Sequence, residues 1–192
     1  MNNYNGNRYR RKKTFYRMKL GIEKFKTNPT LNVLWLGVIL AIYYFIGIKD
    51  WYILSIDVPM LMQRIVRITD YSISFLIPII IALSLLYFVG ELVARKSEAN
   101  LLLVFDEKDL KKGIPLLTSK IRTKNNKITI MEFYTTIPLS KWIEKQDTLQ
   151  DVFNVRFVEE IQYSKGNGRK VLLQMTKGRI QRGSEILIDE RI

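Results

Sequence analysis

The sequence has no cysteine and no histidine among its 192 residues. Without cysteine the chain can form no disulfide and carry out no thiolate chemistry. Without histidine it lacks the commonest general base and the commonest metal ligand. Ser-His-Asp triads, Cys-His dyads and cysteine or histidine zinc sites are therefore excluded.

Charged residues are missing from two stretches, Leu31–Ile48 and Tyr71–Gly90. A bilayer core of about 30 Å needs roughly 20 apolar residues in a helix that rises about 1.5 Å per residue. Both stretches meet that length, so the sequence predicts a membrane protein with transmembrane helices at 27–48 and 71–93. The middle of each span has no acidic or basic residue, which argues against a pump or an ion-coupled transporter.

The basic segment 1–26 has nine Lys and Arg residues against one acid, a surplus of 9 − 1 = +8. In the loop 49–70, three basic and three acidic residues cancel. The positive-inside rule therefore predicts a two-pass protein of the cell membrane with both termini in the cytoplasm and the short loop outside. A signal peptide is the alternative for the first stretch, but Ile46–Trp51 is a poor cleavage site and the basic region is long.

Basic residues beside the first span are predicted to contact the anionic headgroups of the lipid bilayer, at about 1 kcal/mol each. They are Arg10, Arg11, Lys12, Lys13, Arg17, Lys19, Lys24 and Lys26. Trp51 and Tyr52 are predicted interface anchors on the other side of the bilayer. Nucleic-acid phosphates are the alternative ligand of the basic segment. The apolar residues of the loop fit a helix in the outer headgroup region or a contact with another membrane subunit.

Residues 94–182 are predicted to form a small cytoplasmic α+β domain of order β-β-α-β-β, with one helix covering an antiparallel sheet. The predicted elements are strands at Leu116–Arg122 and Ile128–Tyr134, a helix at Leu139–Phe153, a strand at Val155–Tyr163, a turn at Ser164–Gly168 and a return strand whose Val171, Leu173 and Met175 face inwards. Lys124–Asn126 is a further turn signal, and Asn154 is expected to close the helix. Glu98–Phe105 fits either an extension of the second span or a strand.

Gly178 and Gly183 have the spacing of a phosphate-binding loop, but Ser184 and Glu185 stand where that motif requires Lys and Ser or Thr. A carboxylate at this place would repel phosphate. The sequence therefore predicts no nucleotide site and no catalytic, cofactor-binding or metal-binding residue. The chain is not expected to be an enzyme.

The run Ile137-Pro138-Leu139-Ser140-x-Trp142 is followed by Val152-Phe153-Asn154-Val155 and by Gly166-x-Gly168-Arg169-Lys170. These residues resemble the N-terminal region of FtsK/SpoIIIE-type DNA translocases of conjugative elements and plasmids of Gram-positive bacteria. The match lies in hydrophobic and turn positions over residues 137–176. Members are similar in layout: a basic N-terminus, two spans, a small α+β domain and a RecA-like motor ATPase. Residues 183–192 resemble the connector into that motor, but the motor is absent from the sequence and no catalytic residue carries over.

The resemblance implies a membrane-anchoring and assembly module of a DNA translocase or conjugative coupling protein. It implies a homo-oligomer, with an FtsK-like ATPase or secretion-channel components as further partners. Trp142, Leu149 and Phe153 are the candidate assembly surface. The alternative is a stand-alone membrane scaffold or regulatory subunit that binds a protein partner. Subtracting the N-terminal +8 from the net +13 leaves +5 for the rest of the chain, which predicts only weak, non-specific DNA contact.

Overall fold

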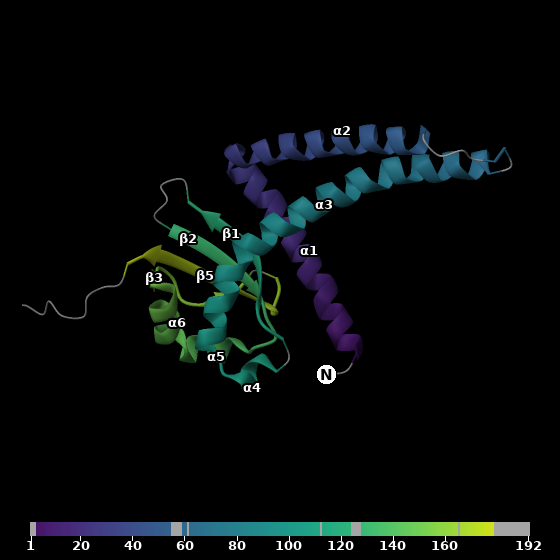
Figure 1. Ribbon diagram of the computed structural model, residues 1–192. Coiled ribbons are helices and arrows are strands. Elements are labelled where there is room, and N and C mark those ends of the chain that lie inside the picture. Colours follow the sequence, from purple (N-terminus) through teal and green to yellow (C-terminus); the bar gives the residue numbers. More distant parts are fainter. Residues whose placement is uncertain are drawn as a thin grey trace, which may run out of the picture. The chain divides into compact units, whose positions relative to one another are not determined.

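The computed structural model describes residues 3–54, 59–60, 62–111, 113–123, 128–164 and 166–178 (Figure 1). The chain divides into two compact units, 1–93 and 94–192, and the boundary falls inside one long helix. The predicted turn at Lys124–Asn126 and the predicted connector 183–192 lie outside the described residues.

The first unit is helical. It contains α1 (Asn3–Thr27), the 3-10 turn η1 (Pro29–Asn32), α2 (Val33–Leu54) and the first part of α3 (Gln63–Val104). Pro29 suits the start of η1, because the first residue of a helical turn needs no N–H partner. The helices of the two uncharged stretches, α2 and α3, are both long and apolar enough to cross a membrane.

The helix α3 is longer than the second predicted span. It has 42 residues and continues through residue 93 to Val104, so the undecided stretch from Glu98 is helical almost to its end. Pro78 lies inside the helix, where it removes one backbone hydrogen bond. The unit boundary at 93/94 divides α3 into a part that belongs to the apolar helices and a part that belongs to the sheet domain.

The second unit is an antiparallel sheet with short helices. The strands are β1 (Leu116–Arg122), β2 (Ile128–Tyr134), β3 (Val155–Phe157), β4 (Gln162–Tyr163) and β5 (Lys170–Lys177). Their order is β1-β2-β5-β3, and β4 also pairs with β5. The helices α4 (Glu107–Leu110), α5 (Leu139–Glu144) and α6 (Gln146–Phe153) complete the unit. The α+β class is as predicted, but the order β-β-α-β-β is wrong at two places.

The predicted helix Leu139–Phe153 is two helices. Lys145 lies between them with φ −92° and ψ 15°, outside the helical region. No glycine or proline stands at 144–146, so nothing in the local sequence announces the break. Asn154 closes α6 as predicted, in the left-handed conformation with φ 51° that asparagine tolerates better than most residues.

The predicted strand Val155–Tyr163 is interrupted. Phe157 is opposite Met175 and Gln162 is opposite Leu172, so the four residues 158–161 face only two residues of β5. Two residues are therefore extra, and they form an irregular bulge between β3 and β4. The alternating pattern hides this bulge, because an even number of extra residues leaves the inward and outward positions unchanged.

The core of the second unit lies between one face of the sheet and the helices. The indole of Trp142 packs against Phe105 with ring centroids 4.8 Å apart and against Phe133 at 5.9 Å. Buried residues with them are Leu101, Val104, Leu116, Leu117, Met131, Leu149, Val155, Ile161, Val171, Leu173 and Met175. The inward positions predicted for the return strand are thus confirmed.

Candidate functional site

The apolar side chains of α2 and α3 are exposed rather than buried. Tyr43 on α2 is 73% exposed and Phe75 on α3 is 70% exposed. No residue of the most apolar window of α2 is buried, and only 11% of that of α3 is. Because contact with water costs about 25 cal/mol per Å² of apolar surface, a soluble helix of this composition would have to cover these side chains. The two helices are therefore suited to an apolar medium.

An ion pair joins α2 and α3 at one end of the uncharged stretches. The ammonium of Lys49 lies 2.6 Å from a carboxylate oxygen of Asp70 and donates a hydrogen bond of 2.6 Å to the hydroxyl of Ser74. That hydroxyl in turn donates to the Asp70 carbonyl oxygen at 2.8 Å. Sequence reasoning counted Lys49 and Asp70 as cancelling loop charges and missed that they contact each other.

A second ion pair joins α1 and α3 at the other end. The Arg17 side chain is fully buried, and its Nε donates to a carboxylate oxygen of Glu91 at 2.5 Å. The ammonium of Lys13 lies 3.8 Å from the other carboxylate oxygen. Arg17 was predicted to contact lipid headgroups; that prediction is wrong, because Glu91 and α3 enclose its guanidinium.

The backbones of α1 and α3 touch beside this ion pair. A Cβ atom added to Gly90 would collide with the carbonyl oxygen of Arg17, and one added to Gly21 would collide with that of Leu86. Only glycine allows this approach. The crossing of α1 over α3 in Figure 1 is therefore specified by two glycines and by the ion pair of the buried Arg17 with Glu91.

The two ion pairs on α3 stand at the ends of its uncharged stretch. Asp70 and Glu91 are separated by 91 − 70 = 21 residues, and no acidic or basic residue lies between them. At about 1.5 Å per residue this corresponds to about 32 Å, close to the hydrocarbon thickness of a bilayer. The sequence contained the two charges, but only the structure pairs each of them with a second helix.

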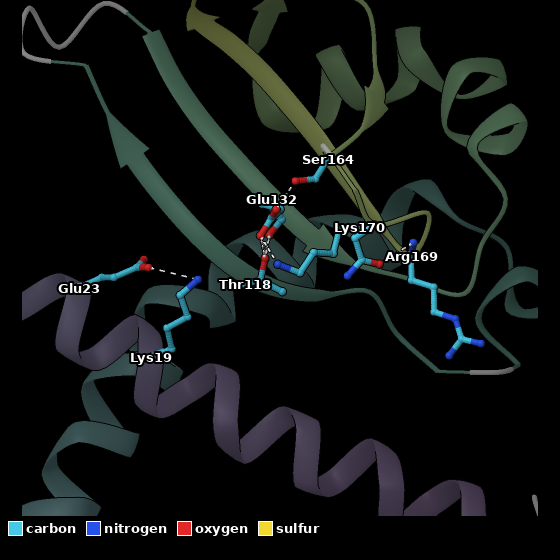
Figure 2. Close-up of polar contacts among 8 residues, drawn as sticks. Lys19, Glu23, Thr118, Glu132, Ser164, Arg169 and Lys170 are labelled. Atoms are coloured by element: carbon cyan, nitrogen blue, oxygen red, sulfur yellow. Dashed lines mark hydrogen bonds and ion pairs between the residues drawn. The ribbon is translucent and has the colours of Figure 1, made fainter.

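The other predicted lipid contacts lie on α1 and at the end of α2. Arg10, Arg11 and Lys26 are exposed, and Lys12, Lys13, Lys19 and Lys24 are half-buried. Lys19 lies 3.5 Å from Glu23 one turn further on (Figure 2). Trp51 is exposed as expected of an interface anchor, whereas the side chain of Tyr52 lies outside the described residues. Phe15, an aromatic residue interleaved with these basic residues, is 65% exposed.

The predicted assembly surface is not a surface. Trp142 and Leu149 are fully buried in the core of the second unit, and Phe153 is half-buried. The apolar periodicity that selected them marks the inward face of α5 and α6. Ile143, next to Trp142, is the apolar residue of α5 that remains exposed.

Glu132, in the middle of β2, holds a polar cluster on the opposite face of the sheet from the core (Figure 2). One carboxylate oxygen accepts hydrogen bonds from Thr118 at 2.6 Å and Lys170 at 2.8 Å, and the other accepts one from Ser164 at 2.5 Å. Thr118 reaches it from an irregularity of β1 between Leu117 and Ser119.

The surroundings of Glu132 keep it ionised. Burial by itself would raise the pKa of the carboxyl, but hydrogen bonds from Lys170, Ser164 and Thr118 and the charge of Lys170 outweigh burial and lower the pKa to about 2. Both oxygens are engaged, so the cluster ties β1 and the β4–β5 hairpin to β2. An acidic residue within the apolar run of β2 was the sequence signal for this cluster, and it was missed.

Metal chemistry finds no support in the described parts of the chain, where no three Asp or Glu residues are grouped as metal ligands would be. Glu159 and Glu160 lie in the bulge between β3 and β4. The Glu159 carboxylate accepts a hydrogen bond from the side chain of Gln174 at 2.5 Å. This contact supports the bulge and does not form a paired-carboxylate site.

No family model matches the sequence, and no curated protein matches it. The first unit is thus a basic helix, α1, followed by a hairpin of two helices, α2 and α3, that are long and apolar enough to cross a membrane. Among solved structures, the chain is similar to the pCW3 conjugation coupling protein TcpA in its monomer form with ATPgS. The identity is 24%, the TM-score is 0.37, and the match covers 44% of this chain and 25% of that one. The chain spans about a quarter of that protein's length.

Proposed function

We propose that this chain is the membrane-anchoring and assembly module of an FtsK/SpoIIIE-like DNA translocase or conjugative coupling protein. The observation that carries the anchoring role is the α2/α3 hairpin, whose apolar side chains are exposed and whose uncharged length in α3 matches a bilayer. In water this apolar surface would remain exposed, whereas the hydrocarbon core of a bilayer would cover it.

The proposed topology has both termini in the cytoplasm. The ion pair of Arg17 with Glu91 then lies at the cytoplasmic boundary of the bilayer, and that of Lys49 with Asp70 lies at the outer boundary. The strong positive charge of α1 favours this orientation. The second unit, which contains the sheet, begins at residue 94 within α3, three residues after Glu91.

The link to DNA transfer rests on the resemblance of residues 137–176 to FtsK/SpoIIIE-type proteins. In this proposal the sheet domain orders subunits of a homo-oligomer, and a motor ATPase that the module serves hydrolyses ATP. DNA contact by the module itself is expected to be weak, because its charge outside α1 is modest.

The topology can be tested cleanly because the chain has no native cysteine. Met60→Cys places a single thiol in the connection between α2 and α3, and Ser140→Cys places one on the exposed side of α5. In intact cells a membrane-impermeant maleimide is expected to label only Met60→Cys, and permeabilisation is expected to expose Ser140→Cys as well. The reverse pattern would contradict the topology, and release of the chain by alkaline carbonate would contradict anchoring.

The assembly role needs a separate test. The full chain is co-expressed with FtsK-like ATPases and cross-linked in membranes. Recovery of oligomers that contain the ATPase is the expected result. A chain that stays monomeric would contradict the assembly role, and a chain that is cross-linked only to proteins without a motor would favour the stand-alone scaffold.

A further inference from the structure

One face of α1 is turned away from α3 and combines basic with apolar residues. It consists of Arg8, Arg11, Phe15, Lys19, Ile22 and Lys26, here called the Phe15 face. The spacings of three and four residues place them on one side of a helix. Phe15 is 65% exposed and Ile22 is 44% exposed, and no acidic residue belongs to the face.

The opposite side of α1 is the side that packs. Arg17 and Leu20 are buried there, and Gly21 contacts the backbone of α3. The burial of one side leaves the Phe15 face uncovered within the first unit. The charge of Arg17 is balanced by Glu91, and on the Phe15 face Lys19 lies 3.5 Å from the half-buried Glu23. Such a pair near the surface contributes little.

Two contacts hold the second half of α1 at the end of the proposed spans. Arg17 is paired with Glu91, the first charged residue after the uncharged stretch of α3. Phe25 packs on Trp35 in the first turn of α2, with ring centroids 5.5 Å apart. The two positions are about 12 Å apart along α1, because eight residues rise about 1.5 Å each. Since both mark the same boundary of the hairpin, this part of α1 runs along the boundary and does not project away from it.

We propose that the Phe15 face of α1 docks on the anionic phospholipid headgroups of the leaflet beside the α2/α3 hairpin, with Phe15 and Ile22 inserted between the lipids. This inference rests on the proposed membrane anchoring and adds a lipid-binding surface to it. Arg8, Arg11, Lys19 and Lys26 match the negative headgroups, and a helix with basic and apolar residues on one face lies in the interface plane. The phosphates of a nucleic acid would pair with the four basic residues but would give Ile22 no apolar environment.

The docking can be followed with the full chain in vesicles. An environment-sensitive fluorophore is attached to Ile22→Cys, and, as a matched position, to Thr14→Cys, which is exposed but lies off the face. Phosphatidylcholine vesicles with and without phosphatidylglycerol are compared. The expected result is a blue-shifted label at 22, shielded from iodide only in anionic vesicles, and a quenchable label at 14 in both.

Charge variants sharpen the test. Arg11→Gln removes a charge from the Phe15 face. Arg10→Gln removes the same charge from an exposed position two turns before Arg17, on the side of α1 that packs, where this proposal does not place the lipid contact predicted for Arg10 from the sequence. Arg11→Gln is expected to shift the docking equilibrium about fivefold towards the free helix, and Arg10→Gln clearly less. Equal effects would overturn the assignment of the face.

Three further outcomes would overturn the lipid docking. A label at 22 that responds to duplex DNA but not to phosphatidylglycerol would overturn lipid docking in favour of a nucleic-acid surface. A label that is quenched alike in both vesicles, in a chain that resists carbonate extraction, would overturn this inference and leave the anchor intact. Carbonate extraction of the chain would overturn the anchor and this inference with it.

Discussion

The two units use apolar residues in opposite ways. In the second unit Phe133 and Trp142 are fully buried between the sheet and the helices that cover it, as the hydrophobic effect in water favours. In the first unit Tyr43 and Phe75 are among the most exposed side chains. Apolar residues therefore form a buried core in the second unit and an exposed surface in the first, so the two units suit different media. Exposure, rather than hydropathy alone, distinguishes them.

Charged residues show the same contrast. In the second unit Glu132 is held by three side chains and ties strands together. In the first unit Arg17 with Glu91 and Lys49 with Asp70 stand where the uncharged stretch of α3 ends. One arrangement stabilises a sheet, and the other marks the limits of an apolar surface.

The largest expected effect is in the second unit. Trp142→Ala removes an indole packed on Phe105 and Phe133, and it is expected to cost about 3–5 kcal/mol of unfolding free energy. Hydrogen exchange of the full chain in detergent is expected to show faster exchange in residues 94–178 and unchanged exchange in α2. Ile143→Ala, at the exposed neighbour, is the control and should change stability by less than about 0.5 kcal/mol. Equal effects of the two variants would contradict the assigned core.

The sharpest comparison of the two units uses one substitution at two sites of similar exposure. Ile80 in the middle of the α3 stretch is 58% exposed, and Ile121 in β1 is 52% exposed. Ile80→Lys is expected to cost about 2.5–3.5 kcal/mol of membrane insertion, measured as the carbonate-resistant fraction. Ile121→Lys should leave that fraction unchanged. If both variants insert normally, the difference in medium between the units is refuted.

A smaller effect is expected at Glu132. Its pKa of about 2 in the folded chain lies below the ordinary 4.5, so its ion pair stabilises the fold fully above about pH 4.5 and is lost as the pH falls towards 2. Glu132→Gln is expected to lower stability at pH 7 by about 1–3 kcal/mol and to reduce the loss on acidification. Denaturation midpoints at pH 7 and pH 3 measure both. The exposed Glu160→Gln should keep the wild-type profile, and a Glu132→Gln profile identical to it would refute the cluster's role.

The smallest expected effect is at the end of α6. Asn154 has φ 51°, a conformation that glycine adopts without strain and a β-branched residue does not. Asn154→Gly should change the thermal midpoint little, and Asn154→Val should cost about 1–2 kcal/mol. A valine variant as stable as the glycine variant would show that α6 ends in another conformation.

Local sequence patterns predicted the regular elements well. The bounds of β1 and β2 agree with the predicted strands, and α2 and α3 contain the two uncharged stretches. These features depend on the polarity of residues a few positions apart, which the sequence displays directly. The break at Lys145 and the bulge at 158–161 were not predicted, because neither segment carries the glycine or proline that usually marks such an irregularity.

The candidate site was predicted only in outline. The sequence alone determined that two long stretches lack charge, that the segment before them is basic, and that a small α+β domain follows. The tertiary structure decided that Arg17 is buried against Glu91 and that Trp142 belongs to a core. Arg17 and Glu91 are 74 residues apart, and periodicity within one helix specifies which side is polar but not which distant residue will meet it. The partners of a charge depend on how helices cross, which in this chain two glycines allow.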